Sequence, residues 1–213
     1  MNKTLIISSL AVIGLFAGAA FFLEKEKVEN PGPVNRISQE KLVKFHSHSL
    51  GNQNAKVKVV EFYDPECESC AAFYPELKKL VDIYKEHVRF VPRYMIYHGN
   101  SKLAAIATEA AGSQGKYWEM QRQLFTSLDW THQQAPQTER FISYAKTLGL
   151  DITRFVKDMN DSSFQSIVES DFEEGKSIGV NGTPTFYVNG RILQELSYEG
   201  LKQLIDEEIN ISK

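Results

Sequence analysis

The segment that decides the fold is Val59-Val60-Glu61-Phe62-Tyr63-Asp64-Pro65-Glu66-Cys67-Glu68-Ser69-Cys70-Ala71-Ala72-Phe73-Tyr74-Pro75. An apolar, β-branched run leads into two cysteines that are separated by two residues. They are the only cysteines in the 213 residues. Within one helical turn their sulfurs can bond to each other, so the pair can hold, accept or donate one disulfide. The sequence therefore predicts a redox-active pair.

A zinc site is the competing interpretation of the CxxC pair. Closed zinc sites need four ligands, which usually include a second CxxC or an HxxxH. No second cysteine pair exists, and the five histidines are scattered along the chain. Only His46 and His48 have a plausible ligand spacing, and we interpret them as solvated residues of the N-terminal segment. No metal site is predicted.

The composition is that of an ordinary globular protein. The chain has 24 Lys and Arg against 27 Asp and Glu, for a net charge of −3, and it carries no long basic run. Nucleic-acid binding would need a basic patch or stripe. The sequence therefore gives no reason to expect a nucleic-acid partner.

An uncharged apolar segment runs from Leu5 to Leu23. As a helix it would span roughly 28 Å, close to the thickness of the hydrocarbon core of a bilayer. Residues 1–23 are therefore predicted to be a membrane anchor or a signal peptide, crossing the membrane through residues 5–23. The positive charge before this segment places the rest of the chain outside the cytoplasm, in the periplasm or at the outer face of the cytoplasmic membrane.

Two features of this segment bear on whether it is a retained anchor or a cleaved signal peptide, and they point in opposite directions. Ala17-Gly18-Ala19 satisfies the small-residue rule for cleavage. Phe21-Phe22-Leu23 continues the apolar run beyond that point, which favours a retained anchor. Residues 24–37 follow with charged and then Pro/Gly-rich composition, which is typical of a linker.

A β-α-β unit is predicted around the CxxC. Residues 56–63 form a β-branched and aromatic run that indicates a buried strand, and residues 88–94 indicate a second one. Between them, apolar residues recur at helical spacing from Cys67 onward. A strand, a helix and a strand in this order predict a parallel pair joined by a crossover helix.

The rest of the chain predicts a helical stretch and then a second strand region. In the helical stretch, helices are expected at residues 101–111, 116–128 and 164–176, together with one that ends at residue 149 and one that begins at residue 151. A strand at 185–188, a type I′ turn at Asn189-Gly190, a strand at 191–194 and a helix at 197–209 are expected to follow. Trp118 and Trp130, in the helical stretch, are expected in the core. The prediction is an α/β fold interrupted by a helical insertion.

Three segments together resemble the DsbA-like thiol:disulfide oxidoreductases of the thioredoxin superfamily. They are the strand that leads from Glu61 to the CxxC, Gln114-Gly115-Lys116-Tyr117-Trp118-Glu119-Met120, and Gly179-Val180-Asn181-Gly182-Thr183-Pro184-Thr185-Phe186. The resemblance implies a DsbA-like thioredoxin domain over residues 38–213, with its helical insertion at about residues 100–176.

The roles of the candidate catalytic residues follow from chemistry and from this resemblance. Cys67, at a helix N-terminus where the free N–H groups favour a thiolate, is expected to be the nucleophile. Cys70 is expected to be the resolving thiol, and the resemblance implies that it is the shielded member of the pair. Glu61 matches the acidic residue that exchanges protons beneath the active site in this family. A glutamate in a salt bridge at the strand end is the alternative for Glu61.

The resemblance further implies a cis peptide between Thr183 and Pro184, facing the CxxC. Client proteins are expected to contact Thr183, Pro184, Glu68 and Ser69. The Glu68-Ser69 dipeptide departs from the Pro-His of the strongest oxidants in the family. Since carboxylates disfavour a neighbouring thiolate, we expect a weaker oxidant.

The predicted function is disulfide exchange with exported cysteine-containing clients, with the protein acting as an oxidant. A reductase or isomerase of the same fold is the alternative, and threonine before the cis proline is commoner in those branches. A copper-handling protein that binds Cu(I) through both cysteines, assisted by His46 or His48, is a third hypothesis. The expected protein is a monomer that works with a membrane redox partner, and its only redox group is the Cys67–Cys70 disulfide.

Overall fold

The structure is a computed structural model that describes residues 36–212. The predicted anchor or signal at residues 1–23, and nearly all of the predicted linker at residues 24–37, lie outside the described residues. Among the helices of the described part, none is both long enough and apolar enough to cross a membrane.

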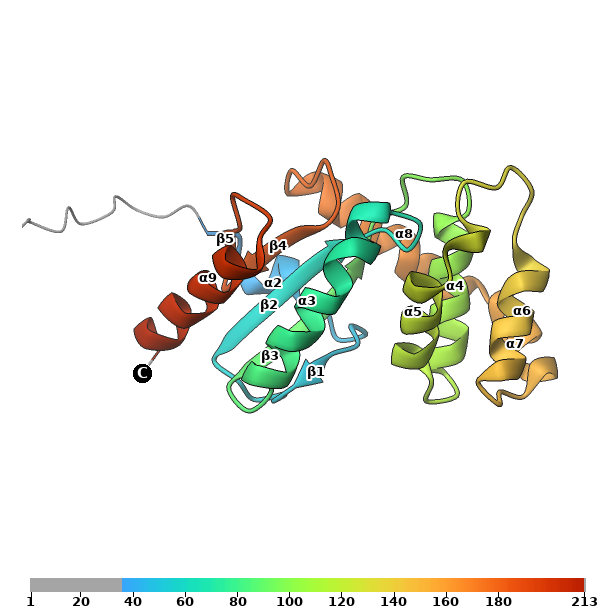
Figure 1. Ribbon diagram of the computed structural model, residues 1–213, viewed down its shortest axis with the longest axis horizontal. Coiled ribbons are helices and arrows are strands. Elements are labelled where there is room, and N and C mark those ends of the chain that lie inside the picture. Colours follow the sequence, from blue (N-terminus) through green and yellow to red (C-terminus); the bar gives the residue numbers. More distant parts are fainter. Residues whose placement is uncertain (1–35, 213) are drawn as a thin grey trace, which may run out of the picture. The chain divides into compact units, whose positions relative to one another are not determined.

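A mixed sheet lies at the centre of the described chain, with the strand order β1-β3-β2-β4-β5 (Figure 1). Its strands are β1 (Leu50–Gly51), β2 (Val57–Tyr63), β3 (Val88–Tyr94), β4 (Thr185–Val188) and β5 (Arg191–Ile192). The central strands β2 and β3 are parallel, and β4 runs antiparallel to β2. The predicted strands at the CxxC and at residues 88–94 are therefore confirmed.

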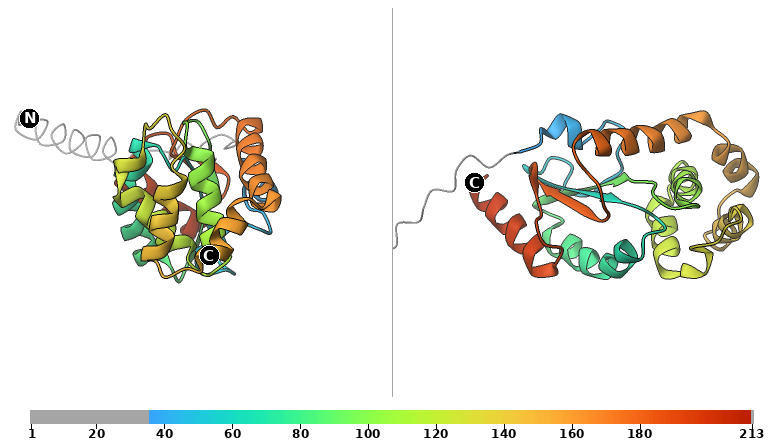
Figure 2. Two further views of the ribbon diagram at one scale, coloured as in Figure 1. Left: turned by 90° about the vertical axis from the view of Figure 1, so that its right-hand side faces the viewer. Right: turned by 90° about the horizontal axis from the view of Figure 1, so that it is seen from above.

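Helix α3 (Glu68–Tyr84) joins β2 to β3 and completes the predicted β-α-β unit. Its apolar side packs on the sheet face that carries Val57 and Val59. Helix α9 (Tyr198–Ile211) covers the same face, while α2 (Gln39–Leu42) and α8 (Ser162–Ser177) lie on the opposite face, where they pack around Val60 and Phe62 (Figure 2). Because alternate residues of β2 point to opposite faces, Glu61 shares the α3 face with Val59.

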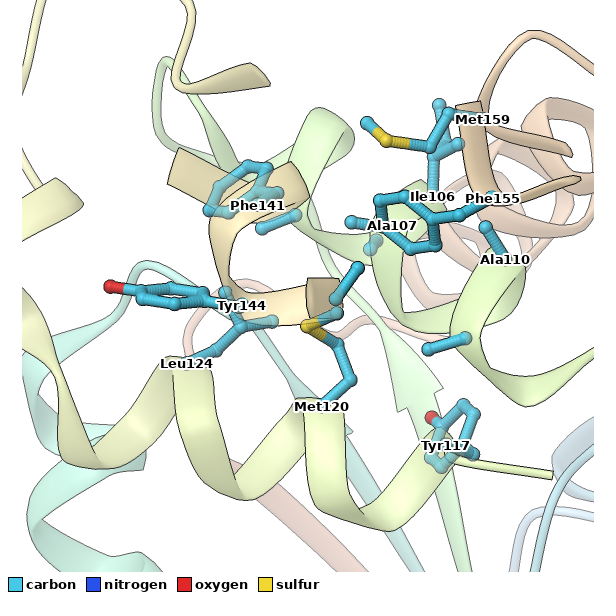
Figure 3. Packing of buried hydrophobic residues seen from close by; sticks show 14 of the residues in the cluster. Ile106, Ala107, Ala110, Tyr117, Met120, Leu124, Phe141, Tyr144, Phe155 and Met159 are labelled. Carbon is cyan, nitrogen blue, oxygen red and sulfur yellow. The ribbon is translucent and has the colours of Figure 1, made fainter. Parts of the chain in front are cut away.

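The segment between β3 and β4 is helical, as predicted. It contains α4 (Ser101–Gly112), α5 (Tyr117–Thr126), the short 3-10 helix η1 (Leu128–Trp130), α6 (Thr138–Thr147), α7 (Ile152–Met159) and α8. Figure 3 shows side chains of α4, α5, α6 and α7 in one apolar core, with Met120 and Phe141 fully buried. Tyr63, Tyr94 and Cys70 belong to the same core, so it reaches the end of the sheet where the CxxC lies.

The hairpin between β4 and β5 follows the predicted turn chemistry. Asn189 and Gly190 both have positive φ values, 46° and 86°, as a type I′ turn requires. The edge strand β1 was not predicted: residues 50–51 pair antiparallel with β3. Two residues are too few for a recognisable alternating pattern, which explains the difference.

Candidate active site

Cys67 lies at the N-terminal boundary of α3, immediately before its first residue Glu68. Its side chain is partly exposed, whereas Cys70, one turn further along, is 1% exposed. Both are free thiols. Glu68 and Ser69 are exposed between them. The structure thus gives the exposed and shielded cysteines that the resemblance implied.

The loop before β4 faces the CxxC. The Thr183–Pro184 peptide is cis, as the resemblance implied, and the Cys67 thiol donates a hydrogen bond to the Thr183 carbonyl oxygen at 3.5 Å. The hydroxyl of Tyr97 donates to the Val180 carbonyl at 3.0 Å and ties this loop to the end of β3. The sequence-predicted residues Cys67 and Thr183 are therefore brought together.

The environment of Cys67 stabilises its thiolate. A hydrogen bond from the Cys70 side chain, together with hydrogen bonds from the Thr183 side chain and from the backbone of Cys70 and Ser69, outweighs partial burial and lowers the pKa of Cys67 to about 5. Hydrogen bonds to the charged form of a group favour that form. Cys67 is therefore ionised at neutral pH, as a thiol nucleophile must be.

The pKa values of Cys70 and Glu61 are raised, in contrast to that of Cys67. Burial, the hydrogen bond to Cys67 and the charge of Glu61 raise the pKa of Cys70. Burial and the charge of Cys67 raise the pKa of Glu61 to about 8. A carboxyl group that titrates near neutral pH can give or take a proton during exchange. Glu61 forms no salt bridge among the described residues.

Glu61 also lines a cavity of about 270 Å³ between the sheet, α3 and α5. Its wall includes Tyr74, Leu77, Trp118 and Gln121, and neither cysteine belongs to it. Trp130 is fully buried, as predicted, whereas Trp118 is only partly buried and lines this cavity. The cavity has room for water beside the Glu61 carboxyl group.

Two acidic residues before the CxxC have a structural role that the sequence did not reveal. Asp64 is 0% and Glu66 is 2% exposed. The Asp64 carboxylate accepts hydrogen bonds from the Glu66 and Tyr97 amides, the Ser101 hydroxyl and the His98 ring. The Asp64 carboxylate therefore joins the loop before the CxxC to residues 97–101.

Glu66 continues this network toward the helical segment. Its carboxylate accepts hydrogen bonds from the backbone amides of Asn100 and His132, each at 2.7 Å. His132 has a positive φ of 56°, a conformation that is costly for a residue other than glycine. The CxxC loop is therefore fastened to two distant segments, at residues 97–101 and at residue 132.

The structure brings His98 and His132 to the CxxC loop, which sequence reasoning missed. Their ring centroids are 6.2 Å apart. His98 Nδ1 lies 2.8 Å from Asp64 and His132 Nε2 lies 3.1 Å from Glu68. In the sequence the five histidines looked scattered, and no local pattern connects these two with residues 64–68.

His46 and His48 have partners away from the CxxC. His46 lies 3.5 Å from Asp171, while His48 contacts Glu109 at 3.1 Å and stacks on Tyr117. Both side chains are partly buried instead of fully solvated. No cluster of His, Cys, Asp and Glu side chains suited to a metal ion occurs within residues 36–212.

Solved structures with the same fold include two that share more than a quarter of their residues with this chain. BdbD from Bacillus subtilis, in its oxidised form, is 27% identical with a TM-score of 0.70, over 83% of this chain and 97% of that one. A thioredoxin-like oxidoreductase from Silicibacter pomeroyi is 28% identical with a TM-score of 0.70, over 80% and 97%.

The thiol-disulfide exchange protein α-DsbA2 from Wolbachia pipientis shares the fold at 21% identity and a TM-score of 0.69, over 78% of this chain and 89% of that one. Among curated proteins, a Na⁺/H⁺ antiporter NhaA from Herminiimonas arsenicoxydans is 35% identical over 147 residues. These are 69% of this chain but 23% of the antiporter. The chain spans about a quarter of the length of the curated relatives that it matches.

The family comparison covers most of the chain. Residues 44–207 match the family model described as thioredoxin, which is more than half of the 213 residues. The match includes β2, the CxxC, the helical segment and the cis-proline loop. The chain therefore belongs to the thioredoxin family, and its fold is similar to that of BdbD and of the thioredoxin-like oxidoreductase.

Proposed function

We propose that the protein oxidises exported cysteine-containing proteins outside the cytoplasm, with Cys67 and Cys70 as its catalytic thiols. The observation that carries the proposal is the contrast between the two cysteines. Cys67 is accessible and its pKa is lowered to about 5, whereas Cys70 is buried and its pKa is raised. A nucleophile and a shielded resolving thiol are what stepwise disulfide exchange requires.

The reaction proceeds through a mixed disulfide. A client thiolate attacks Cys67 of the Cys67–Cys70 disulfide, a bond forms between the client sulfur and Cys67, and Cys70 leaves with the electron pair. Glu61 supplies the proton that Cys70 takes up, since burial raises the pKa of both groups. A second client thiolate then attacks the first client sulfur and releases Cys67 as a thiolate. The client is oxidised by two electrons and the enzyme is reduced by two.

The client segment is proposed to lie against Thr183 and Pro184, with the exposed Glu68 and Ser69 at its edge. Thr183 already contacts the Cys67 sulfur through its carbonyl oxygen. Backbone groups that pair with an extended peptide bind many sequences, because they do not read side chains. This arrangement supports a broad range of clients.

The low pKa of Cys67 supports the oxidising direction. Stabilising the thiolate stabilises the reduced enzyme, so the disulfide form transfers its disulfide more readily. The reductase or isomerase alternative has no comparable support in the geometry of Cys67. The copper alternative invoked His46 or His48, and both of these have carboxylate partners elsewhere.

The proposed setting is the outer side of the cytoplasmic membrane, with residues 5–23 as the anchor. Each turnover leaves Cys67 and Cys70 reduced, so a membrane redox partner must accept two electrons from them. The protein is proposed to act as a monomer.

The redox state of the CxxC in cells tests the direction. The free thiols of the full-length protein are alkylated in intact cells and the two forms are separated by mass. A mostly disulfide form is the expected result. A mostly dithiol form would reject the oxidant role in favour of the reductase or isomerase, while loss of all exchange with glutathione would reject disulfide exchange itself.

A further inference from the structure

A histidine lies beside the CxxC loop although the dipeptide between the two cysteines contains none. His98 follows β3 and precedes α4. Its Nδ1 is 2.8 Å from Oδ2 of Asp64, and the Cys67 amide donates to the Asp64 carbonyl oxygen at 3.1 Å. Asp64 therefore holds the ring through its side chain and the cysteine through its backbone.

Asp64 is a rigid support for that ring. It is fully buried, and its carboxylate also accepts from the Glu66 and Tyr97 amides and from the Ser101 hydroxyl. A carboxylate that accepts from this number of donors cannot turn away without leaving buried donors unpaired. His98 therefore has a fixed position and a fixed partner.

The charged groups around His98 come from each neighbouring segment. The CxxC loop contributes Asp64, Glu66 and the Cys67 thiolate, and the segment before α6 contributes the ring of His132. Burial would lower the pKa of His98, but the hydrogen bond and charge of Asp64, with the charges of Cys67 and Glu66, raise it above its ordinary value. The imidazolium form is therefore more favoured than in an unperturbed histidine.

We propose that His98, positioned by Asp64, carries the positive charge that stabilises the Cys67 thiolate and makes the Cys67–Cys70 couple more oxidising. The Glu68-Ser69 dipeptide contains no imidazole, and His98 supplies one from a different segment. This inference rests on the proposed function in that Cys67 is taken as the exchanging thiol. His98 acts through the charge on Cys67, and Asp64 acts through His98.

His98 and the Cys67 thiolate must stabilise each other's charge equally. If the imidazolium stabilises the thiolate, the thiolate must stabilise the imidazolium by the same free energy. Disulfide formation removes the negative charge on Cys67, so His98 must bind its proton less tightly in the oxidised protein. For two charges in a partly buried site, the difference is about 3- to 10-fold in the proton-binding constant.

The first experiment measures the pKa of His98 in both redox states. Histidine-labelled full-length protein, kept in detergent, is titrated by NMR as the dithiol and as the disulfide. Only five histidine signals occur, and the signal lost in His98→Asn identifies residue 98. A higher pKa of His98 in the dithiol form is expected. Equal values in both forms would overturn the proposal, even where the wild type exchanges disulfides normally.

The second experiment uses variants in equilibrium with glutathione. His98→Asn retains a hydrogen-bond donor near the Nδ1 position but carries no charge. It is expected to raise the pKa of Cys67, followed by thiolate absorbance, and to make the couple about 3- to 10-fold less oxidising near neutral pH. The difference from wild type must shrink at a pH where His98 is neutral in both redox states, which a folding defect would not do.

Matched variants complete the test. Asp64→Asn is expected to lower the pKa of His98 and to shift the couple in the same direction as His98→Asn. His87→Asn, at an exposed histidine before β3, is expected to change neither quantity. A shift confined to His132→Gln would overturn the proposal. A wild type that does not exchange with glutathione at all would instead reject the proposed function.

Discussion

The Cys67 sulfur and the Thr183 carbonyl oxygen lie 3.5 Å apart, although 116 positions separate the two residues in the chain. β4 pairs with β2 in a register that places Phe186 opposite Glu61, and this pairing brings the cis-proline loop to the end of β2 where α3 begins. The sheet therefore assembles the nucleophile, the loop that faces it and the buried carboxyl group from separate segments.

The two cysteines are expected to respond differently to substitution. Cys67→Ser should abolish exchange, because the accessible thiolate is lost. Cys70→Ser should leave the attack by Cys67 intact and accumulate mixed disulfides with clients, because only the resolving thiol is missing. Non-reducing electrophoresis of alkylated cell extracts measures this accumulation. Equal trapping by both variants would contradict the assigned roles.

Thr183→Val tests the side-chain hydrogen bond of Thr183 to Cys67 and leaves the backbone carbonyl contact in place. The side-chain bond lowers the pKa of Cys67, so removal of the hydroxyl should raise that pKa and make the couple less oxidising, with little change in shape. A loss of one hydrogen bond to a charged sulfur corresponds to about 1–2 pKa units. Thr183→Ser, which keeps the hydroxyl, is the control and should stay close to wild type. An unchanged pKa in Thr183→Val would exclude the side-chain contribution.

Glu61→Gln should change how stability depends on pH. In the reduced folded protein the carboxyl group keeps its proton up to about pH 8, whereas its unperturbed pKa is 4.5. The folded state therefore binds more protons between these two values, so the free energy of unfolding falls as the pH rises through this window and levels off above it.

The glutamine variant lacks that dependence and should be more stable than wild type at pH 8, by on the order of a few kcal/mol, with little difference at pH 4. Urea unfolding at several pH values measures it. Glu86→Gln, at an exposed glutamate, is the control. If Glu61 also delivers the proton to Cys70, Glu61→Gln should slow exchange while it raises stability, a combination that a structural salt bridge would not produce.

Local patterns in the sequence were sufficient to predict most of the fold. The Asn189-Gly190 turn and the starts of the helices expected from residues 151 and 197 all depend on chemistry within a few residues, and each is present in the structure. The same holds for the strand and helix that flank the CxxC. The edge strand β1 was missed because its two residues exist only through pairing with β3.

The surroundings of the CxxC could not be predicted in the same way. No local pattern indicated a structural role for Asp64 and Glu66. They are buried acceptors for residues that lie 33 to 66 positions further along the chain. Which way a carboxylate points depends on donors from other segments. Sequence patterns report local periodicity and capping, so the approach of His98 and His132 also required the folded chain.

The dipeptide between the cysteines is expected to influence the redox potential of the pair. The Glu68 side chain is 76% exposed, beside Cys67 and 3.1 Å from His132 Nε2. Replacing Glu68-Ser69 with Pro-His removes one negative charge and adds an imidazole at the start of α3. Both changes favour the thiolate, so the pKa of Cys67 should fall below about 5 and the couple should become more oxidising.

Glu68→Gln separates the two contributions, because it removes the charge without adding a ring. Exposed charges are screened by solvent and salt, so its effect should be small and should decrease further as the ionic strength rises. Thiolate absorbance against pH and equilibration with glutathione measure both variants. If the Pro-His protein is no more oxidising than wild type, the dipeptide does not set the redox potential of this protein. The pKa of Cys67 would then be set by Thr183 and by the loop that carries His98.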